Sequence, residues 1–379
     1  MFENFRVFKT ELCGKPISFE TGKMCGLSNG SCVVRYGETT VMVNVTASLK
    51  PRDGIDFFPL SVDYEEKLYS VGKIPGSFLK REGRPSDKAI LVSRLVDRPI
   101  RPLFPKDMRN DCSVVMTVLS VDPDYSPEIA GMLGTSFALS ISDIPWNGPI
   151  AGVSVGLVGG EIIVNPNAEQ RAKSDLNLTV AGTADKICMI EAGANEVDNE
   201  TMLNAIIEGH KEIKKMVKFI SDVQAEIGKP KFGFESQEVD HDIFEAIKDF
   251  AIEKVRFALD TDDKLIREER LAPIMDEVHA KFDELHPDKI AMIDECMYKL
   301  QKYVVRRWLL DDGKRVDGRG LDEIRPLAAE VGIVPRVHGS GLFTRGQTQV
   351  LTITTLGPVS DAQILDGIDG EESKRYMHH

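Results

Sequence analysis

The sequence predicts a mixed α+β protein in which one strand-rich architecture is written twice, with a helical segment between the two copies. Residues 1 to about 195 alternate apolar and polar residues between glycine-containing turns, the pattern of half-buried strands. Residues from about 198 to 310 contain almost no glycine and repeat with the period of an α-helix. From Asp311 the glycine-rich strand pattern returns. We therefore expect three domains, over residues 1–195, 196–310 and 311–379.

The composition restricts the class of protein. The chain has 379 residues, of which 42% are hydrophobic and 28% are charged, as in ordinary globular domains. Its net charge of −13 excludes a protein coated all over with positive charge, although not a local basic patch. The six cysteines are scattered without a Cys-x-x-Cys pair, so we expect neither a disulfide framework nor a zinc site. No apolar signal segment or membrane-spanning run is present, so we expect a cytoplasmic protein that does not enter a membrane.

The first zone contains the clearest strand signals. Residues 31–36 and 39–47 predict a hairpin, because Val41, Val43 and Val45 alternate onto one face. The other predicted elements are a strand over 113–121, a helix over 127–142, a hairpin over 153–164 that turns at Gly159-Gly160, and strands over 176–180 and 187–190.

The middle zone predicts several helices. Asp198 or Asn199 can cap the first of them. Its expected apolar face contains Leu203, Ile206, His210, Ile213, Val217 and Ile220. Further helices are expected near residues 242–259, 263–285 and 288–310. Mixed charges along these helices indicate a solvated face rather than a binding stripe.

An internal repeat is the most informative feature of the sequence. Residues 30–41 align without gaps to residues 339–350, at a constant offset of 309. Upstream, residues 20–22 match residues 330–332 after a gap of one residue. One such match could arise by chance, but two matches in order favour a duplication. At this offset His379 corresponds to a position near 70 of the first copy, so we expect the second copy to be cut off early and the chain to be a fragment.

A basic cluster stands out within the acidic chain. Residues 76–109 contain nine Lys and Arg against four Asp and Glu. The basic residues are Lys80, Arg81, Arg84, Lys88, Arg94, Arg98, Arg101, Lys106 and Arg109. Phe78 lies next to Lys80 and Arg81 in a stretch marked by glycine and proline. A stacking aromatic beside cations that can hold phosphates suits single-stranded nucleic acid.

Structural ion pairs are the alternative interpretation of this cluster, and the sequence does not decide between the two. Arg94, Asp97, Arg98 and Arg101 are spaced so that one helical face could pair them internally. Lys80 and Arg81 lie on the glycine-containing loop and are therefore the better ligand candidates.

Four sequence strings resemble bacterial polynucleotide phosphorylase. They are residues 75–86 (PGSFLKREGRPS), 94–104 (RLVDRPIRPLF), 316–319 (VDGR) and 338–346 (HGSGLFTRG). The likeness runs from Phe2 to His379. It implies two RNase PH-like cores, of the ribosomal-S5-domain-2-like fold, joined by an all-helical domain. It also implies a ring-shaped homotrimer.

The resemblance implies a phosphorolytic 3′-to-5′ exoribonuclease that acts in RNA turnover. Inorganic phosphate would be the co-substrate, nucleoside diphosphates the products, and Mg²⁺ or Mn²⁺ the assisting metal. The reverse reaction polymerises nucleoside diphosphates without a template. Single-stranded RNA, and other members of an RNA-degradation complex, would be the partners.

The same resemblance assigns candidate site residues. The RNA-binding candidates are Phe78, Leu79, Lys80, Arg81 and Arg84, on the loop that lines the RNA channel in the family. Leu79 and Lys80 stand where the family more often has Phe and Arg, so we expect a weaker grip on bases. Arg319 and Arg345 resemble residues near the second copy's active site, with strand-end salt bridges as the alternative.

The first copy departs from the family's catalytic pattern in two places. The family's phosphate cradle resembles a serine run at a helix start, whereas this chain has Ser126-Pro127-Glu128. The family's metal site resembles Asp-x-Lys ahead of Val-Ala-Gly-Thr, whereas residues 177–179 here are Asn-Leu-Thr. We therefore expect that this copy does not perform phosphorolysis and that the chain holds neither a complete catalytic set nor metal ligands.

Two rival interpretations remain. The chain could be a non-catalytic module that binds single-stranded RNA or supports a ring. A single-core tRNA-trimming phosphorylase is the third possibility, but it fits poorly with a helical insert between two repeats.

Overall fold

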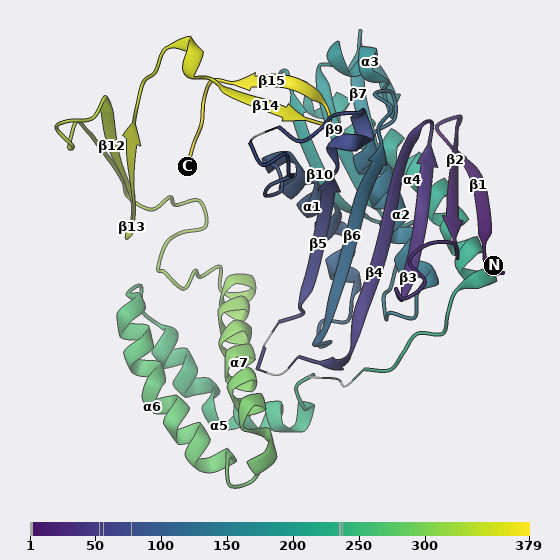
Figure 1. Cartoon of the computed structure of the whole chain (residues 1–379). Helices are drawn as coiled ribbons and strands as arrows, with labels where there is room; N and C mark the ends of the chain where they lie inside the picture. Colours follow the sequence, from purple (N-terminus) through teal and green to yellow (C-terminus); the bar gives the residue numbers. More distant parts are fainter. Residues whose placement is uncertain (1–2, 53, 56, 77, 235, 237) are drawn as a thin grey trace. The chain divides into compact units, whose positions relative to one another are not determined.

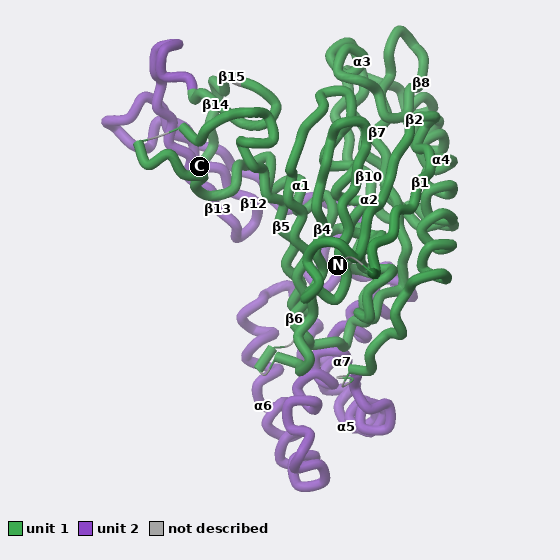
Figure 2. The backbone as a smooth tube through the Cα atoms, turned by 45° about the vertical axis from the view of Figure 1, so that its right-hand side comes forward, with its two compact units in different colours: residues 1–237, 363–379 green, residues 238–362 purple. Residues whose placement is uncertain are grey.

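A computed structural model of the chain describes residues 3–52, 54–55, 57–76, 78–234, 236 and 238–379. The chain divides into two compact units, residues 1–237 with 363–379, and residues 238–362 (Figure 2). Among the described helices, none combines the length and the apolar character that crossing a membrane requires.

A six-stranded sheet forms one layer of the first unit, in the order β1-β2-β3-β4-β6-β5 (Figure 1). Its strands are β1 (Arg6–Leu12), β2 (Lys15–Thr21), β3 (Gly30–Tyr36), β4 (Thr39–Pro51), β5 (Leu60–Glu66) and β6 (Asn110–Ser120). Neighbouring strands are antiparallel except β5 and β6, which run parallel. The sequence predicted β3, β4 and β6. It missed β1, β2 and β5, because charged residues interrupt the apolar alternation of these strands.

A four-stranded sheet, in the order β10-β9-β7-β8, forms a second layer. Its strands are β7 (Ala151–Val158), β8 (Glu161–Val164), β9 (Leu176–Gly182) and β10 (Ile187–Ala194). The predicted turn at Gly159 and Gly160 is confirmed, and both residues have positive φ, the conformation that favours glycine.

Helix α2 (Pro127–Ile141) packs against β3 and β4 of the first sheet and against β7 of the second. Every residue of α2 from Ile129 onward is buried. Gly134 permits the close approach, because a Cβ atom there would lie 2.7 Å from methyl groups of both Val34 and Val43. The predicted helix over 127–142 is therefore confirmed, and it forms the centre of the core.

The remaining helices of the first unit are α1 (Asp87–Ile100), α3 (Ala168–Ala172) and α4 (Asn199–Ile227). Asp198 caps α4 as predicted, by accepting hydrogen bonds from the backbone of Glu200 and Thr201. The predicted apolar face of α4 was wrong at Leu203, which is exposed, because the buried stripe through Ile213 lies about a quarter turn away.

Helix α4 also packs on β7, β9 and α2, within the first unit. The expected end of the first RNase PH-like core at residue 195 stays a prediction.

The second unit contains three helices and a three-stranded sheet. The helices α5 (His241–Leu259), α6 (Lys264–Phe282) and α7 (Ile290–Asp311) share an apolar core. Their bounds agree with the predicted segments to within a few residues. The strands β11 (Leu327–Val331), β12 (Gly339–Arg345) and β13 (Thr348–Thr354) pair in sequence order.

The internal repeat is confirmed at the level of strand register. In the first unit Gly30 pairs with Val45, and in the second Gly339 pairs with Thr354, at the same offset of 309 residues. The turn glycines Gly37 and Gly346 have nearly identical φ angles of 59° and 60°. The strand that precedes each ribbon also pairs in the same way: β2 is antiparallel to β3, and β11 is antiparallel to β12.

The last two strands, β14 (Gln363–Gly367) and β15 (Gly370–Lys374), form a hairpin that belongs to the first unit. Ile368, in its turn, is only 4% exposed and joins the main core. The chain therefore returns to the first unit after leaving the second.

Candidate functional site

The loop over residues 75–86 precedes α1, and apart from the half-buried Pro75 its described residues are exposed; Ser77 lies outside the described residues. Phe78 is 98% exposed, and Lys80 adopts a left-handed φ of 50°. The base of the loop is held by Glu82, which accepts a hydrogen bond from the backbone N–H of Leu68 at 2.9 Å. Ser86 then caps α1. The loop is therefore fixed at its ends and presents its middle to solvent.

A groove of about 840 Å³ runs beside this loop. Its walls come from the end of β5 and the following turn, from the loop, and from the turn of the β14–β15 hairpin. Lys80, Arg81 and Arg84 line it, whereas Phe78 and Leu79 are not among its lining residues. The structure therefore brings together three of the five predicted RNA-binding residues around one groove.

The cations of this groove differ in their pairing. Lys67 forms ion pairs with Glu65 and Glu82, and Lys73 forms one with Asp366. No described carboxylate forms an ion pair with Lys80, Arg81 or Arg84. These three side chains are consequently available to an anion from outside.

Two arginines at the C-terminal end of α1, Arg98 and Arg101, behave in the opposite way. Arg101 binds Asp97 with two hydrogen bonds, of 2.9 Å and 2.7 Å. Arg98 pairs with Glu191 on β10 at 2.9 Å. The ion-pair interpretation of the basic cluster therefore holds for these two arginines of the helical segment and does not hold for the loop.

The N-terminus of α2 carries a carboxylate instead of a free anion-binding end. Ser126 caps the helix by accepting a hydrogen bond from Ile129 N–H, and its hydroxyl donates to Glu128 Oε2 at 2.5 Å. Lys88 Nζ lies 2.9 Å from Glu128 Oε1. Burial alone would raise the pKa of Glu128, but Lys88 and Ser126 lower it below the usual value of a glutamate. The carboxylate is therefore ionised in this position.

Residues 177–179, the segment of the first copy where the family resemblance places metal ligands, contain no carboxylate. Asn177 and Thr179 occupy β9 ahead of Val180, so the strand carries no carboxylate there. In the part of the chain that the structure describes, no group of three His, Cys, Asp or Glu side chains is arranged to hold a metal ion. The described residues at this end of β9 do not fit a divalent metal.

The two arginines of the second copy lie in different settings. Arg319 binds Asp317 through Nε at 2.9 Å and Nη2 at 2.7 Å, and it also donates to the carbonyl of Glu323. Arg345 ends β12 and is exposed. No hydrogen bond or ion pair joins the two within the described residues, so their place near an active site stays a prediction.

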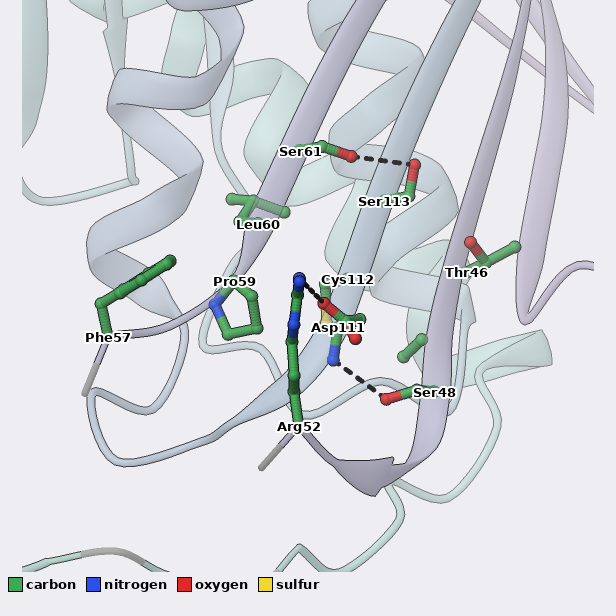
Figure 3. A pocket seen from close by; sticks show the side chains of 11 residues that line it. Thr46, Ser48, Arg52, Phe57, Pro59, Leu60, Ser61, Asp111, Cys112 and Ser113 are labelled. Atoms are coloured by element: carbon green, nitrogen blue, oxygen red, sulfur yellow. Dashed lines mark hydrogen bonds and ion pairs between the residues drawn. The ribbon is translucent and has the colours of Figure 1, made fainter. Parts of the chain in front are cut away.

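A second pocket, of about 550 Å³, lies at one end of β4, β5 and β6 (Figure 3). Arg52 closes it with an ion pair to Asp111 at 3.3 Å, and Ser61 Oγ lies 3.2 Å from Ser113 Oγ (Figure 3). Burial raises the pKa of the Cys112 thiol, which lines the pocket, to about 12, so this cysteine is unreactive. Sequence reasoning missed this pocket, because only the pairing of the strands brings its walls together.

Three family descriptions match consecutive parts of the chain. The first domain of the 3′ exoribonuclease family matches residues 14–145, and its second domain matches residues 148–212. The RNA-binding domain of polyribonucleotide nucleotidyltransferase matches residues 242–320, which contain the helices of the second unit.

Curated relatives match almost the whole chain. A polyribonucleotide nucleotidyltransferase of Ruminiclostridium cellulolyticum is 60% identical over 375 residues, covering 99% of this chain and 53% of the relative. One of Clostridioides difficile is 55% identical over 382 residues, covering 100% of this chain and 54% of the relative. Among solved structures, rice Rrp46 aligns with a TM-score of 0.47 and 15% identity, covering 56% of this chain and 96% of that one.

The family descriptions agree with the α+β fold of the first unit and with the helical segment of the second. The chain spans about half the length of the curated relatives it matches. It belongs to the polyribonucleotide nucleotidyltransferase family, with an RNase PH-like fold in its first unit.

Proposed function

We propose that the chain is part of a phosphorolytic 3′-to-5′ exoribonuclease. Inorganic phosphate would attack the terminal phosphodiester of RNA and release a nucleoside diphosphate, and the reverse reaction would extend RNA without a template. The observation that carries this proposal is 60% identity, over 99% of the chain, to a protein named polyribonucleotide nucleotidyltransferase.

Within the chain, we propose that the loop over residues 75–86 contacts single-stranded RNA. Lys80, Arg81 and Arg84 line one groove, and no carboxylate among the described residues forms an ion pair with them, so they can neutralise phosphates. Phe78 is exposed beside them and can stack on a base, whereas Leu79 offers only apolar contact. The arrangement supports binding that depends on salt and tolerates many base sequences.

We also propose that the chain alone is catalytically incomplete. Phosphate attacking a phosphodiester brings two anions together, so the site needs positive donors. The Glu128 carboxylate stands at the helix start where such donors would be required, and β9 supplies no metal ligand. The Mg²⁺ or Mn²⁺ that the family uses would therefore depend on groups other than these.

The remaining expectations follow from the family alone. We propose a homotrimer, partners in RNA degradation, a cytoplasmic location, and a division into a first RNase PH-like core over residues 1–195, an all-helical domain over 196–310 and the start of a second core over 311–379.

The activity is tested by incubating the purified chain with poly(A), phosphate and Mg²⁺ and measuring nucleoside diphosphate. We expect no release above background, while the full-length relative from Ruminiclostridium cellulolyticum serves as the positive control. Substantial release by the chain would contradict its incompleteness. Absence of phosphorolysis by the full-length relative would contradict the family-level proposal.

RNA binding is tested with the double variant Lys80→Ala/Arg81→Ala. Loss of two phosphate contacts should reduce the salt dependence of poly(A) binding by about 1.4 in log–log slope. The matched control is Lys211→Ala/Lys218→Ala on the exposed side of α4, whose lysines already pair with neighbouring acids. An unchanged slope in the loop variant would remove these residues from the RNA path.

A non-catalytic RNA-binding or ring-scaffold module is the second candidate. Two observations favour it. Lys80, Arg81 and Arg84 form no ion pair with a described carboxylate, and the Glu128 carboxylate, paired with Lys88, occupies the N-terminus of α2. Salt-dependent RNA binding by the chain, together with failure of the full-length relative to release nucleoside diphosphates, would favour this candidate.

A further inference from the structure

Lys88 of α1 joins two parts of the chain that are far apart in sequence. Its ammonium lies 2.9 Å from Glu128 Oε1 at the start of α2. The same ammonium donates to Asp369 Oδ2 in the turn of the β14–β15 hairpin. Burial by itself would lower the pKa of Lys88, but Glu128 and Asp369 raise it above the usual value of a lysine. One cation therefore serves two carboxylates.

The surroundings of Lys88 contain further anionic groups. Glu66 accepts a hydrogen bond from Ser86 at 2.6 Å, and burial raises the pKa of its carboxyl. Tyr64 is only 2% exposed, and its hydroxyl has no hydrogen-bond partner among the described residues. Burial, together with the nearby Glu128 and Glu66 carboxylates, raises the pKa of Tyr64 well above its usual value. A buried hydroxyl donor is thus left over beside the start of α2.

We propose that Glu128 is a built-in anion that fills the anion-binding end of α2 and that, through Lys88, it fixes the β14–β15 hairpin onto the first unit.

The first half of this proposal follows from helix electrostatics. The N-terminus of a helix favours negative charge, because its N–H groups lack partners and the helix dipole points its positive end there. Glu128 supplies this charge from the chain itself, and Ser126 and Lys88 supply the hydrogen bonds that a bound oxyanion would otherwise receive. The negative charge of the Glu128 carboxylate therefore repels a phosphate ion from the place that the carboxylate already occupies.

The second half follows from how the hairpin is held. Ile368 in the turn of the hairpin is buried in the core. Besides the contact with Lys88, the hairpin forms the ion pairs Lys73–Asp366 at 2.6 Å and Lys374–Asp87 at 3.7 Å. The side chains of these two pairs are partly or largely exposed. Exposed pairs contribute little. The side chains of Lys88 and Asp369 are exposed to a similar degree, 41% and 46%, so this pair differs from the others only because the Lys88 ammonium also binds the largely buried Glu128. Asp369 therefore binds a cation whose position is fixed in advance.

Hydrogen–deuterium exchange tests the hairpin. In Lys88→Met, amides of residues 363–374 should exchange at least about 10-fold faster than in the wild type, since a local stability loss of 1.4 kcal/mol is tenfold. In the comparison variant Lys73→Met, which removes the ion pair with Asp366 and a hydrogen bond to the carbonyl of Gly367 but no contact with a second carboxylate, we expect a clearly smaller change. Unchanged exchange in β3 and β4 verifies that the fold is intact.

The variant Asp369→Asn tests the same contact from the hairpin. Asp369 is partly exposed, so we expect the variant to fold. It should reproduce the exchange of Lys88→Met. Equal exchange of the hairpin in wild type, Lys88→Met and Asp369→Asn would overturn the docking role, as would an effect of Lys73→Met as large as that of Lys88→Met.

Thermal unfolding with inorganic phosphate tests the built-in anion. Glu128→Ala leaves the Lys88 ammonium and the Ser126 hydroxyl at the N-terminus of α2 without this carboxylate. Its Tm should rise by about 2–4 °C at a phosphate concentration ten times Kd, relative to chloride of equal ionic strength. The wild type and Glu128→Ala/Lys88→Met should show no such rise. Absence of a rise in Glu128→Ala, or an equal rise in the wild type, would overturn this part of the proposal.

Discussion

The β3–β4 ribbon of the first unit and the β12–β13 ribbon of the second have the same strand register and the same turn, yet their environments are opposite. Val41 on β4 is completely buried, whereas Val350, its equivalent 309 residues later on β13, is 53% exposed. Every residue of β13 is exposed. Strand register is thus set locally, by alternation and by a glycine turn, whereas burial requires a remote element.

Helix α2 is that remote element in the first unit. It packs across β3 and β4, and Gly134 and Gly30 allow the two backbones to approach. The stabilisation of the first ribbon therefore comes from packing. Equivalent substitutions in the two ribbons should therefore show how much of the unfolding free energy comes from packing against α2 and how much from the hairpin alone.

The largest difference is expected for Val41→Ala against Val350→Ala. Removing two methyl groups from the buried site should cost about 2–3 kcal/mol of unfolding free energy, because it leaves a cavity. The exposed equivalent should change by less than about 0.5 kcal/mol. Urea unfolding followed by fluorescence of Trp146 in the first unit and Trp308 in the second measures both. Equal effects at the two sites would refute the contrast.

A glycine pair should give effects of opposite sign. At Gly30 an added Cβ would lie 2.3 Å from the backbone oxygen of Ala138, so Gly30→Ala should cost about 1–3 kcal/mol. At Gly339 the nearest atom is Thr354 Cβ at an ordinary 3.5 Å, so Gly339→Ala should be neutral or stabilise by up to about 1 kcal/mol. The same urea titration decides, and destabilisation of similar size in both variants would contradict the proposed close approach to α2.

A threonine pair tests buried hydrogen bonds. Thr39 Oγ1 donates to the carbonyl of Tyr125 at 2.8 Å and accepts from Asp122 N–H at 2.9 Å. Thr39→Val leaves both groups without this partner and should cost about 1–3 kcal/mol. Its equivalent Thr348 is exposed, so Thr348→Val should have almost no effect. The comparison fails if the cost at Thr39 falls to that at Thr348.

The smallest effect is expected at Asp317, where charge rather than burial organises the start of the second copy. Hydrogen bonds from Arg319, opposed by slight desolvation, hold the pKa of Asp317 below its usual value. Because the pKa of Asp317 is lower in the folded chain than in the unfolded chain, its ionised form stabilises the fold. This stabilisation is complete above the unfolded-state pKa of about 3.9 and is lost as the pH falls through the folded-state pKa.

Asp317→Asn should therefore cost up to about 1 kcal/mol at pH 7, reduced by solvent screening. The difference from wild type should disappear as pH falls below about 4 and should shrink in 1 M salt. Thermal unfolding across pH 3–7 measures it. A cost that stays constant over this range would show that the carboxylate charge is not responsible.

The same contrast applies to the candidate sites. The exposed loop was accessible to sequence reasoning, because Phe78, Lys80 and Arg81 act within one short segment. The contact of Lys88 with Glu128 and Asp369 was not, because Asp369 lies 281 residues from Lys88 in the chain. The sequence could identify Glu128 as a carboxylate at a helix start, but only the folded chain shows which cation neutralises it.

The sequence by itself determined what depends on neighbours along the chain. The hairpin register, the glycine turns at Gly37 and Gly346 and the Asp198 cap all follow from short-range hydrogen bonding and backbone sterics. Only the tertiary structure decided which of two equivalent ribbons is buried, which basic residues are paired and where the last hairpin docks. Burial and charge pairing depend on groups distant in sequence, and folding alone brings those groups together.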